Sequence, residues 1–271
     1  MRECSAVKKI FLLLICVLLL AHGCAAHEQR VAGWPSFGDS VEFGGKKYSR
    51  LLAIGDIHGQ FSRFMSMYEK VGVNDDDLVI FLGDYIEGYK AGEDLKTVLW
   101  LMEQSRKENF VLLSGNWERK FLQDCIDEQG NLKNAPKRHL VQELKAANDP
   151  GLIKKVRDFF SNLKFDQELQ AGGRTLVFSH AGIKDGVPLD QQSEYDLMFN
   201  KRFCREYAGE PFVVIGHRPV QAEFGKNTTV PVKVEGRNIL MVDTNCRREK
   251  GFSSCVNVLT GEFWQSDTDR Q

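Results

Sequence analysis

Six residues that could bind a metal follow five short apolar runs of this chain. The run that ends at Ile54 is followed by Asp56 and His58, a carboxylate and an imidazole two residues apart. The other four runs are followed by an acid, an amide or an imidazole: Asp84, Asn116, His180 and His217. Any one of these runs, taken alone, is most simply a strand that ends in a turn. Their repetition favours a metal site.

Oxygen and imidazole ligands of this kind suit Mn, Fe or Zn better than a metal that prefers thiolates. Six ligands are too many for a single ion that keeps an open position. They suit a pair of ions that share a bridging carboxylate. The residue types therefore predict a two-metal site.

The elements that must position these residues follow from the spacing of the apolar side chains. Helical spacing predicts helices over 61–71 and 93–107. Strand patterns occupy seven further ranges: 51–54, 78–82, 110–113, 174–179, 212–216, 238–243 and 255–264. Helices alternate with strands early in the chain, and strands dominate late. This order indicates an α+β, α/β-like fold of two packed mixed β-sheets flanked by helices.

Residues 118–170 differ from the rest of the chain. They are charged, have helical spacing and are interrupted at Gly130, Pro136 and Asp149. We expect a helical cap or insert above the strand ends, where it could contribute to substrate recognition. His139 in this segment is expected to be an exposed helix residue, not a ligand. The insert belongs to a single domain over residues 27–271.

Residues 1–26 have the pattern of a secretory signal peptide. Lys8 and Lys9 precede an apolar run, and the small residues 23–26 follow it. The run is too short to span a bilayer comfortably, so a membrane anchor is not expected. We expect a secreted or periplasmic protein. A lipoprotein acylated at Cys24 is the alternative, although the preceding residues match that signal poorly.

Charge and cysteine content narrow the function further. Removing residues 1–26, with three basic residues and one acid, changes the formal net charge from −1 to −3. There is no basic stripe, so no nucleic-acid partner is expected. Four cysteines remain, and they allow two disulfides or a mixture of one bridge and buried thiols: Cys125, Cys204, Cys246 and Cys255. The last two are the nearest pair. The sequence does not indicate the oligomeric state.

The motifs, taken in order, carry a family resemblance. They read Gly-Asp-Ile-His-Gly, Gly-Asp-Tyr, Gly-Asn-x-Glu, Ser-His-Ala-Gly and Gly-His-Arg-Pro. This set resembles the calcineurin-like metallophosphoesterases. It is most similar to the bacterial-type branch of the phosphoprotein phosphatase family, which is related to diadenosine tetraphosphatases. The resemblance covers residues 50–264, and the combination is specific although each single motif is not.

The resemblance implies an αββα sandwich with two divalent cations at the strand ends. Mn is the first choice, with Fe or Zn as alternatives. The implied ligands of the first ion are Asp56, His58 and Asp84. Asp84 would bridge to the second ion, which the following residues complete: Asn116, His180 and His217. Two cations about 3.5–4 Å apart can share a hydroxide that attacks a phosphoryl group in line.

The chain departs from the family pattern on the substrate side of the site. The motif histidine that would protonate the leaving oxygen is Trp117, whose indole N–H is not a useful acid. The aspartate that would pair with that histidine is Glu87. Two arginines that would bind phosphate are Gly88 and Ser114. The metal ligands are therefore complete, while the acid and the phosphate-binding positions are altered.

Other arginines could replace the missing ones. Arg218 is the first candidate, and Arg119 and the pair Arg247 and Arg248 are the others. Each could equally be an ordinary surface arginine. We count four residues as candidate catalytic residues: Asp84, Asn116, Glu87 and Arg218.

Two functions fit this pattern. The first is an exported metal-dependent phosphatase that hydrolyses phosphate monoesters of proteins or small molecules. Without an acid it should prefer aryl phosphates such as phosphotyrosine, or phosphoanhydrides as in a nucleoside polyphosphate hydrolase, because their leaving groups need less protonation. The second is a binding module, a pseudophosphatase that keeps its metals and turns over little. The complete ligand set favours the enzyme.

Overall fold

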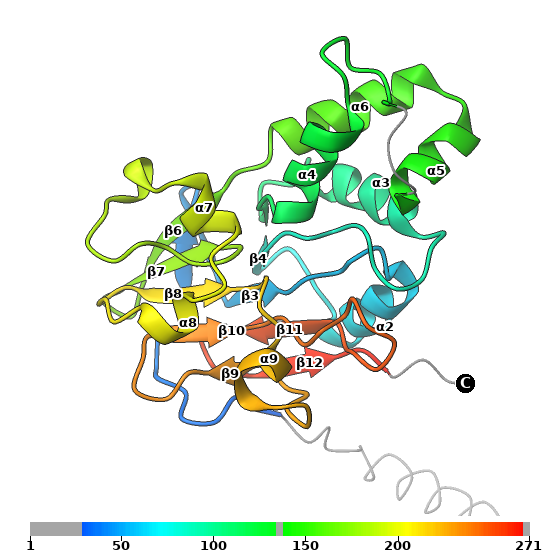
Figure 1. The fold of residues 1–271 in the computed structure, drawn as a ribbon. Coiled ribbons are helices and arrows are strands. Elements are labelled where there is room, and N and C mark those ends of the chain that lie inside the picture. The colour runs from blue at the N-terminus through cyan, green and yellow to red at the C-terminus, as the bar shows by residue number, and fades with distance from the viewer. Residues whose placement is uncertain (1–28, 134–137, 268–271) are drawn as a thin grey trace, which may run out of the picture.

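The computed structural model describes residues 29–133 and 138–267, and within them two five-stranded sheets pack face to face (Figure 1). In spatial order the first sheet consists of β12 (Phe263–Gln265), β11 (Ser254–Asn257), β3 (Arg50–Ile54), β4 (Asp77–Phe81) and β5 (Phe110–Leu112). The second consists of β6 (Asp166–Ala171), β7 (Arg174–Ser179), β8 (Phe212–Ile215), β10 (Ile239–Met241) and β9 (Val232–Lys233). The expected pair of mixed sheets is confirmed.

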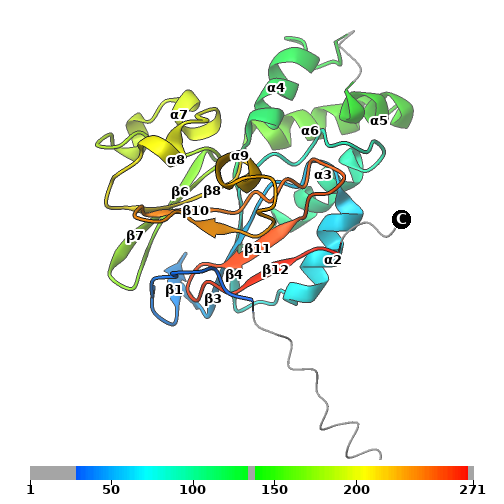
Figure 2. The same ribbon diagram turned by 60° about the horizontal axis from the view of Figure 1, so that its bottom comes forward.

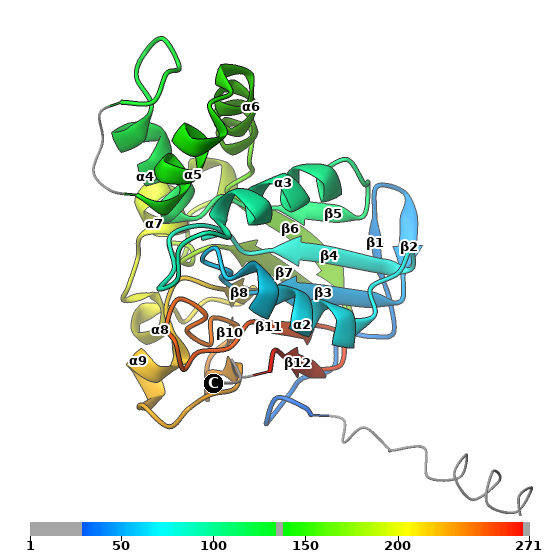
Figure 3. The same cartoon turned by 90° about the vertical axis from the view of Figure 1, so that its right-hand side faces the viewer.

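Strand alternation divides the interior into layers. In β3, Leu51 and Ala53 face the core between the sheets, whereas Leu52 and Ile54 face the core under the helices. Helices α2 (Phe61–Val71) and α3 (Asp94–Gln104) cover the outer face of the first sheet, in front of β3 and β4 in Figure 3. Short helices cover the second sheet: α7 (Glu194–Met198), α8 (Phe203–Glu206) and α9 (Val220–Phe224).

The strand directions bring the ends of separate runs to one edge. Strand β4 pairs in parallel with both β3 and β5, and β8 pairs in parallel with both β7 and β10. The carboxyl ends of parallel strands in one sheet lie at the same edge. The loops that leave five of these strands, β3, β4, β5, β7 and β8, therefore carry the predicted metal ligands to the same end of the sandwich.

The insert is helical for most of its expected length. It consists of α4 (Asn116–Cys125), α5 (His139–Ala147) and α6 (Pro150–Ser161), which stand together at one end of the molecule in Figures 1 and 2. The predicted C-terminal boundary at residue 170 was too late, because residues from 166 form β6, which pairs with β7. His139 is partly buried, and its Nδ1 lies 3.8 Å from Oδ2 of Asp94. His139 is therefore a helix residue as expected, but it is less exposed than predicted.

Short elements and the cysteines complete the description. Residues 41–48 form a short hairpin, of β1 (Val41–Phe43) and β2 (Lys46–Tyr48), and Leu189–Gln191 form a 3₁₀ turn. On α3, Leu99 is exposed and Leu101 is buried. All four cysteines are buried free thiols, so the expected disulfide is not formed.

The signal-peptide prediction lies outside the described residues. Across residues 29–133 and 138–267, no helix combines the length and the apolar character needed to cross a bilayer.

Candidate metal centre

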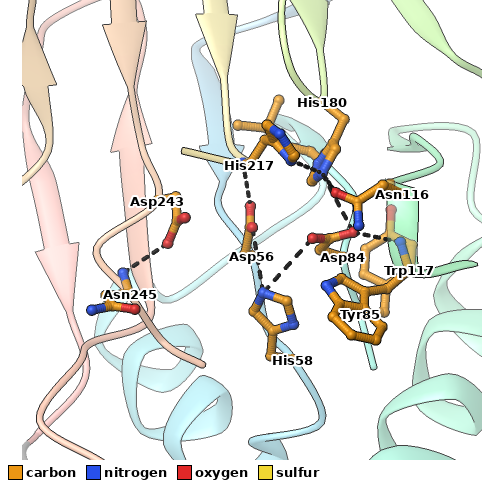
Figure 4. Close-up of polar contacts among 12 residues, drawn as sticks. Asp56, His58, Asp84, Tyr85, Asn116, Trp117, His180, His217, Asp243 and Asn245 are labelled. Carbon is orange, nitrogen blue, oxygen red and sulfur yellow. Dashed lines mark hydrogen bonds and ion pairs between the residues drawn. The ribbon is translucent and has the colours of Figure 1, made fainter. Parts of the chain in front are cut away.

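The predicted ligands meet at the strand ends in two overlapping groups. Asp56, His58 and Asp84 form one group, and Asp84, His180 and His217 form the other. In each group the candidate ligand atoms all lie within 4.8 Å of one another. Figure 4 shows Asp84 between the histidines of the two groups, where its carboxylate faces both. Sequence and structure therefore agree that Asp84 is the shared carboxylate.

The candidate ligand atoms lie within hydrogen-bond or ion-pair distance of one another. Nε2 of His58 lies 3.6 Å from Asp56 Oδ2 and 3.7 Å from Asp84 Oδ2. Nε2 of His180 lies 3.3 Å from Asp84 Oδ1, 3.3 Å from Asn116 Oδ1 and 3.2 Å from Nδ1 of His217. Asn116, at the start of α4, thus joins the second group as predicted.

Backbone carbonyls orient two of the imidazoles. Nδ1 of His58 donates to the Ile86 carbonyl at 3.0 Å, and Nδ1 of His180 donates to the Leu82 carbonyl at 2.8 Å. Each bond leaves Nε2 directed at the carboxylates, as is typical of metal-binding histidines whose other ring nitrogen donates to a carbonyl. His217 is held differently, because its backbone N–H donates to Asp56 Oδ1 at 3.0 Å.

The backbone at three ligands adopts an uncommon conformation. His58, Asp84 and His217 have φ values of 51°, 52° and 59°, in the left-handed region that non-glycine residues rarely occupy. Such strain persists only where the surrounding structure fixes it, and it gathers at functional sites. The glycine before Asn116 allows a close approach, because a Cβ on Gly115 would lie 2.3 Å from Asp84 Oδ1.

Glu118 holds the two central ligand loops together. Its carboxylate accepts backbone N–H groups from Asp84 at 2.9 Å, Tyr85 at 2.8 Å and Gly115 at 2.9 Å. Burial and the neighbouring Asp84 raise the pKa of Glu118 to about 7, while the backbone donors favour its carboxylate form. This residue lies in the Gly-Asn-x-Glu motif, but the motif alone does not indicate its role.

Charge within the cluster is strongly coupled. Burial disfavours the cationic form of His58, but Asp56 and Asp84 outweigh it and raise the pKa of His58 to about 9. In the same way Asp84 raises the pKa of His180 to about 10. Burial and His180 lower the pKa of His217 to about 3, which keeps this imidazole neutral. The carboxylates therefore attract cations, whether protons or metal ions.

The chemistry of these residues fits divalent cations. Oδ2 of Asp56 and Nε2 of His217 are buried without a hydrogen-bond partner among the described residues. Nδ1 of His217 and Nε2 of His180 face each other at 3.2 Å, although burial and His180 itself keep His217 neutral. A cation between these nitrogens and the shared carboxylate would satisfy them. The donor set of carboxylates, imidazoles and one amide matches the sequence expectation.

Asp243 is a further acid at this edge that the sequence analysis left without a role. It follows β10, is buried, and accepts the N–H of Asn245 at 2.7 Å (Figure 4). Burial and the nearby Asp56 raise the pKa of Asp243 to about 8. Its position after a strand, like that of the six ligands, was the signal that could have identified it.

A cleft of about 650 Å³ opens above the ligands. Its walls carry six cationic side chains: Lys120, Lys201, Arg202, Arg218, Arg247 and Arg248. Aromatic rings of Trp117, Tyr195 and Phe199 also line it. Arg119 does not line the cleft, because it pairs with Glu194 and links α4 to α7. Its proposed phosphate-binding role is therefore not supported.

The surroundings of three altered motif positions differ from one another. A Cβ on Gly88 would lie 2.1 Å from the His58 carbonyl oxygen, so no side chain fits where the family pattern has arginine. Glu87 is buried, and its Oε1 has no hydrogen-bond partner among the described residues. The backbone N–H of Trp117 donates to Asp84 Oδ1 at 2.9 Å, and its ring lies edge-on to His58.

Comparisons with known proteins agree with this architecture. A family model for calcineurin-like phosphoesterases matches residues 49–243. Over 68 residues, 25% of this chain and 22% of the relative, the sequence is 32% identical to serine/threonine-protein phosphatase PP1-delta of Caenorhabditis elegans. The match thus spans only about a fifth of that phosphatase.

Two solved structures share the fold. A candidate diadenosine tetraphosphatase superposes with a TM-score of 0.53 at 18% identity, covering 76% of this chain and 88% of the other. A serine/threonine phosphatase from Saccharomyces cerevisiae, described as similar to human PP5, gives 0.51 at 14% identity, covering 76% and 71%. At these identities the likeness concerns the fold alone.

The two-sheet sandwich and the clustered ligands at its edge define a metal-dependent phosphoric ester hydrolase fold. The chain belongs to the calcineurin-like phosphoesterase family.

Proposed function

We propose that this protein is an exported two-metal phosphatase that hydrolyses phosphate monoesters, with a preference for aryl phosphates such as phosphotyrosine. The observation that carries the proposal is the pair of ligand groups sharing Asp84 at the base of a cleft lined with cations. The substrate would be a phosphorylated protein or a small phosphate ester. Export rests on the signal-like pattern of residues 1–26.

The proposal includes two divalent cations, with manganese as the first choice and iron or zinc as alternatives. The first ion would be held by Asp56, His58 and Asp84. The second would be held by four residues: Asp84, Asn116, His180 and His217. When bound, the ions supply Lewis acidity and an activated water at neutral pH.

The chain's own residues supply binding and orientation. Side chains such as Lys201 and Arg218 line the cleft with positive charge suited to a phosphoryl group. Trp117 lines the wall beside Asp84 but cannot donate a proton to a leaving oxygen. Without that proton, alkoxide leaving groups suffer most. Phenolates leave more easily, and the rings of Tyr195 and Phe199 provide an apolar surface for an aryl group.

The decisive experiment measures hydrolysis of an aryl phosphate by the purified protein with and without Mn²⁺, beside an Asp84→Asn variant. We expect Mn²⁺-dependent turnover that falls about 10³-fold or more in the variant, since the shared ligand is lost. Elemental analysis should find two metal ions per wild-type chain. Two bound ions without turnover would contradict the proposal and favour a pseudophosphatase.

Leaving-group preference needs a separate measurement. Matched phosphotyrosine and phosphoserine peptides should differ in kcat/KM by about 10²-fold or more, because an absent general acid costs most for the poorer leaving group. Equal rates would refute the aryl preference while leaving the phosphatase assignment intact. Faster hydrolysis of a nucleoside polyphosphate than of either peptide would move the substrate class to phosphoanhydrides.

A further inference from the structure

Three cationic side chains lie over the ring of Trp117. The Cζ atom of Arg247 is 4.3 Å from a ring centroid, Nζ of Lys120 is 4.9 Å away and Cζ of Arg138 is 5.0 Å away. Cation–π contacts of this length are attractive, and they hold the positive groups in a fixed position. Trp117 therefore gathers positive charge directly beside the metal ligands Asp84 and His58.

Arg247 differs from its two neighbours on the ring. Arg138 pairs with Asp124 at 3.2 Å and does not line the cleft. Lys120 lines the cleft and also lies 5.9 Å from the Phe199 ring. Arg247 lines the cleft, is partly buried, and makes no ion pair with any described residue.

The surroundings of Arg247 suit an anionic ligand. Burial lowers the pKa of Arg247, and Asp84 acts in the opposite direction. A partly buried guanidinium without a carboxylate partner is unfavourable unless a ligand compensates for its lost hydration. Its planar donors match the oxygens of a phosphoryl group.

The backbone around Arg247 is fixed from beneath. The buried guanidinium of Arg63, on α2, donates to the carbonyls of Cys246 at 3.2 Å, Arg248 at 2.7 Å and Glu249 at 2.8 Å. Just upstream, Asn245 has a left-handed φ of 71° and is bonded to Asp243. The backbone is thus fixed both before and after Arg247, as expected for a preorganised binding residue.

The other candidate arginines are engaged or remote. Nε of Arg218 pairs with Glu223 at 2.7 Å. Arg119 is bound to Glu194 away from the cleft. Arg248 is exposed at the rim. Arg247 alone among these four combines partial burial, a stacking surface and freedom from ion pairs with the described residues.

We propose that Arg247 binds the phosphoryl group of the substrate and stabilises the negative charge that grows on it, with Trp117 as the platform that holds the guanidinium. The inference rests on the proposed hydrolysis. In that reaction a water oxygen forms the new bond to phosphorus and the bond from phosphorus to the leaving oxygen breaks, with its electron pair staying on that oxygen. The proton that the attacking water releases passes to the solvent. Arg247 neither gains nor loses a proton.

The test compares Arg247→Gln with Arg138→Gln, which removes a cation from the same ring outside the cleft. Inorganic phosphate is titrated calorimetrically into each Mn²⁺-loaded protein. Arg247→Gln should weaken phosphate binding about 10–100-fold, as expected for a lost charged hydrogen bond. It should also lower kcat/KM for aryl phosphates about 10²-fold. Arg138→Gln should change either value less than about threefold, and both variants should keep the wild-type metal content.

Added guanidinium should restore part of the turnover of Arg247→Gln. The proposal is overturned if Arg247→Gln binds phosphate within threefold of the wild type, or if wild type binds none. It is also overturned if Arg138→Gln loses as much as Arg247→Gln, since both would then only support Trp117. The titration decides the binding role even when no substrate is hydrolysed, so failure of the proposed hydrolysis is a distinct result.

Discussion

The metal centre and the cleft wall above it are built in different ways. Each ligand directly follows a strand end or the short loop beyond it, and all except the partly buried His217 are buried. Backbone bonds hold them, such as that from His180 to the Leu82 carbonyl. The wall consists of long side chains from separate loops, such as Lys120, Lys201 and Arg247. The centre depends on local backbone geometry, whereas the wall depends on distant side chains meeting. The residues of the metal centre can therefore be altered little, whereas those of the cleft wall can change one at a time.

Lowering the pH should weaken metal binding at the centre before it changes the charge of the cleft wall. In the absence of metal, Asp56 and Asp84 hold the pKa of His58 near 9, and Asp84 holds that of His180 near 10. Below pH 9 each ion must therefore displace one proton, so its affinity should rise about tenfold per pH unit, or about 100-fold from pH 6 to 8. Calorimetry in buffers of different ionisation enthalpy would count the released protons. An affinity independent of pH over this range would contradict the prediction.

Removing the support of the centre should have the next largest effect. Glu118→Gln loses an acceptor and places amide hydrogens against backbone N–H groups of Asp84, Tyr85 and Gly115. We expect Mn²⁺ affinity to fall about 10–100-fold and unfolding free energy to drop by about 2 kcal/mol. Metal titration and urea unfolding would measure these.

Glu143→Gln is the matched control for Glu118→Gln. Glu143 also accepts three backbone N–H groups, from Gly92, Asp94 and Leu95, at the start of α3. The Glu143→Gln variant should be less stable than the wild type but should retain its metal affinity. Equal losses of metal affinity in both variants would show that Glu118 acts through general stability alone.

Trp117→His tests how the cleft wall affects the preference between leaving groups. The new imidazole can donate a proton, but the platform under Arg247 is lost. We expect the ratio of alkyl to aryl phosphate turnover to rise about tenfold, while the aryl rate stays level or falls. Steady-state kinetics with both esters would measure the ratio. A large rise in both rates would mean that the native site had been disabled.

Arg119→Gln should have the smallest effect. Arg119 and Glu194 are both partly exposed, so their ion pair contributes under about 1 kcal/mol. Turnover should stay within about twofold of wild type, with unfolding measured alongside. A loss comparable to that of Arg247→Gln would return Arg119 to the list of phosphate-binding candidates.

The sequence predicted the centre better than the wall for a physical reason. The apolar runs before Asp84 and His217 placed these residues at strand ends, and parallel pairing of the neighbouring strands brings the ends within each sheet to one edge. The stacking of Arg247 on Trp117 brings together loops that are remote in the chain, and local spacing carries no signal of that contact. The free thiol of Cys255, in β11, likewise reflects packing that spacing alone does not specify.

The division of the ligands between the two sheets has a mechanical consequence. Asp56, His58 and Asp84 follow strands of the first sheet, while His180 and His217 follow strands of the second. An ion bound to Asp84 and His180 would link the first sheet to the second at the edge where the ligands lie. Metal occupancy would then resist shear between the layers, and the gain in stability would follow the free metal concentration.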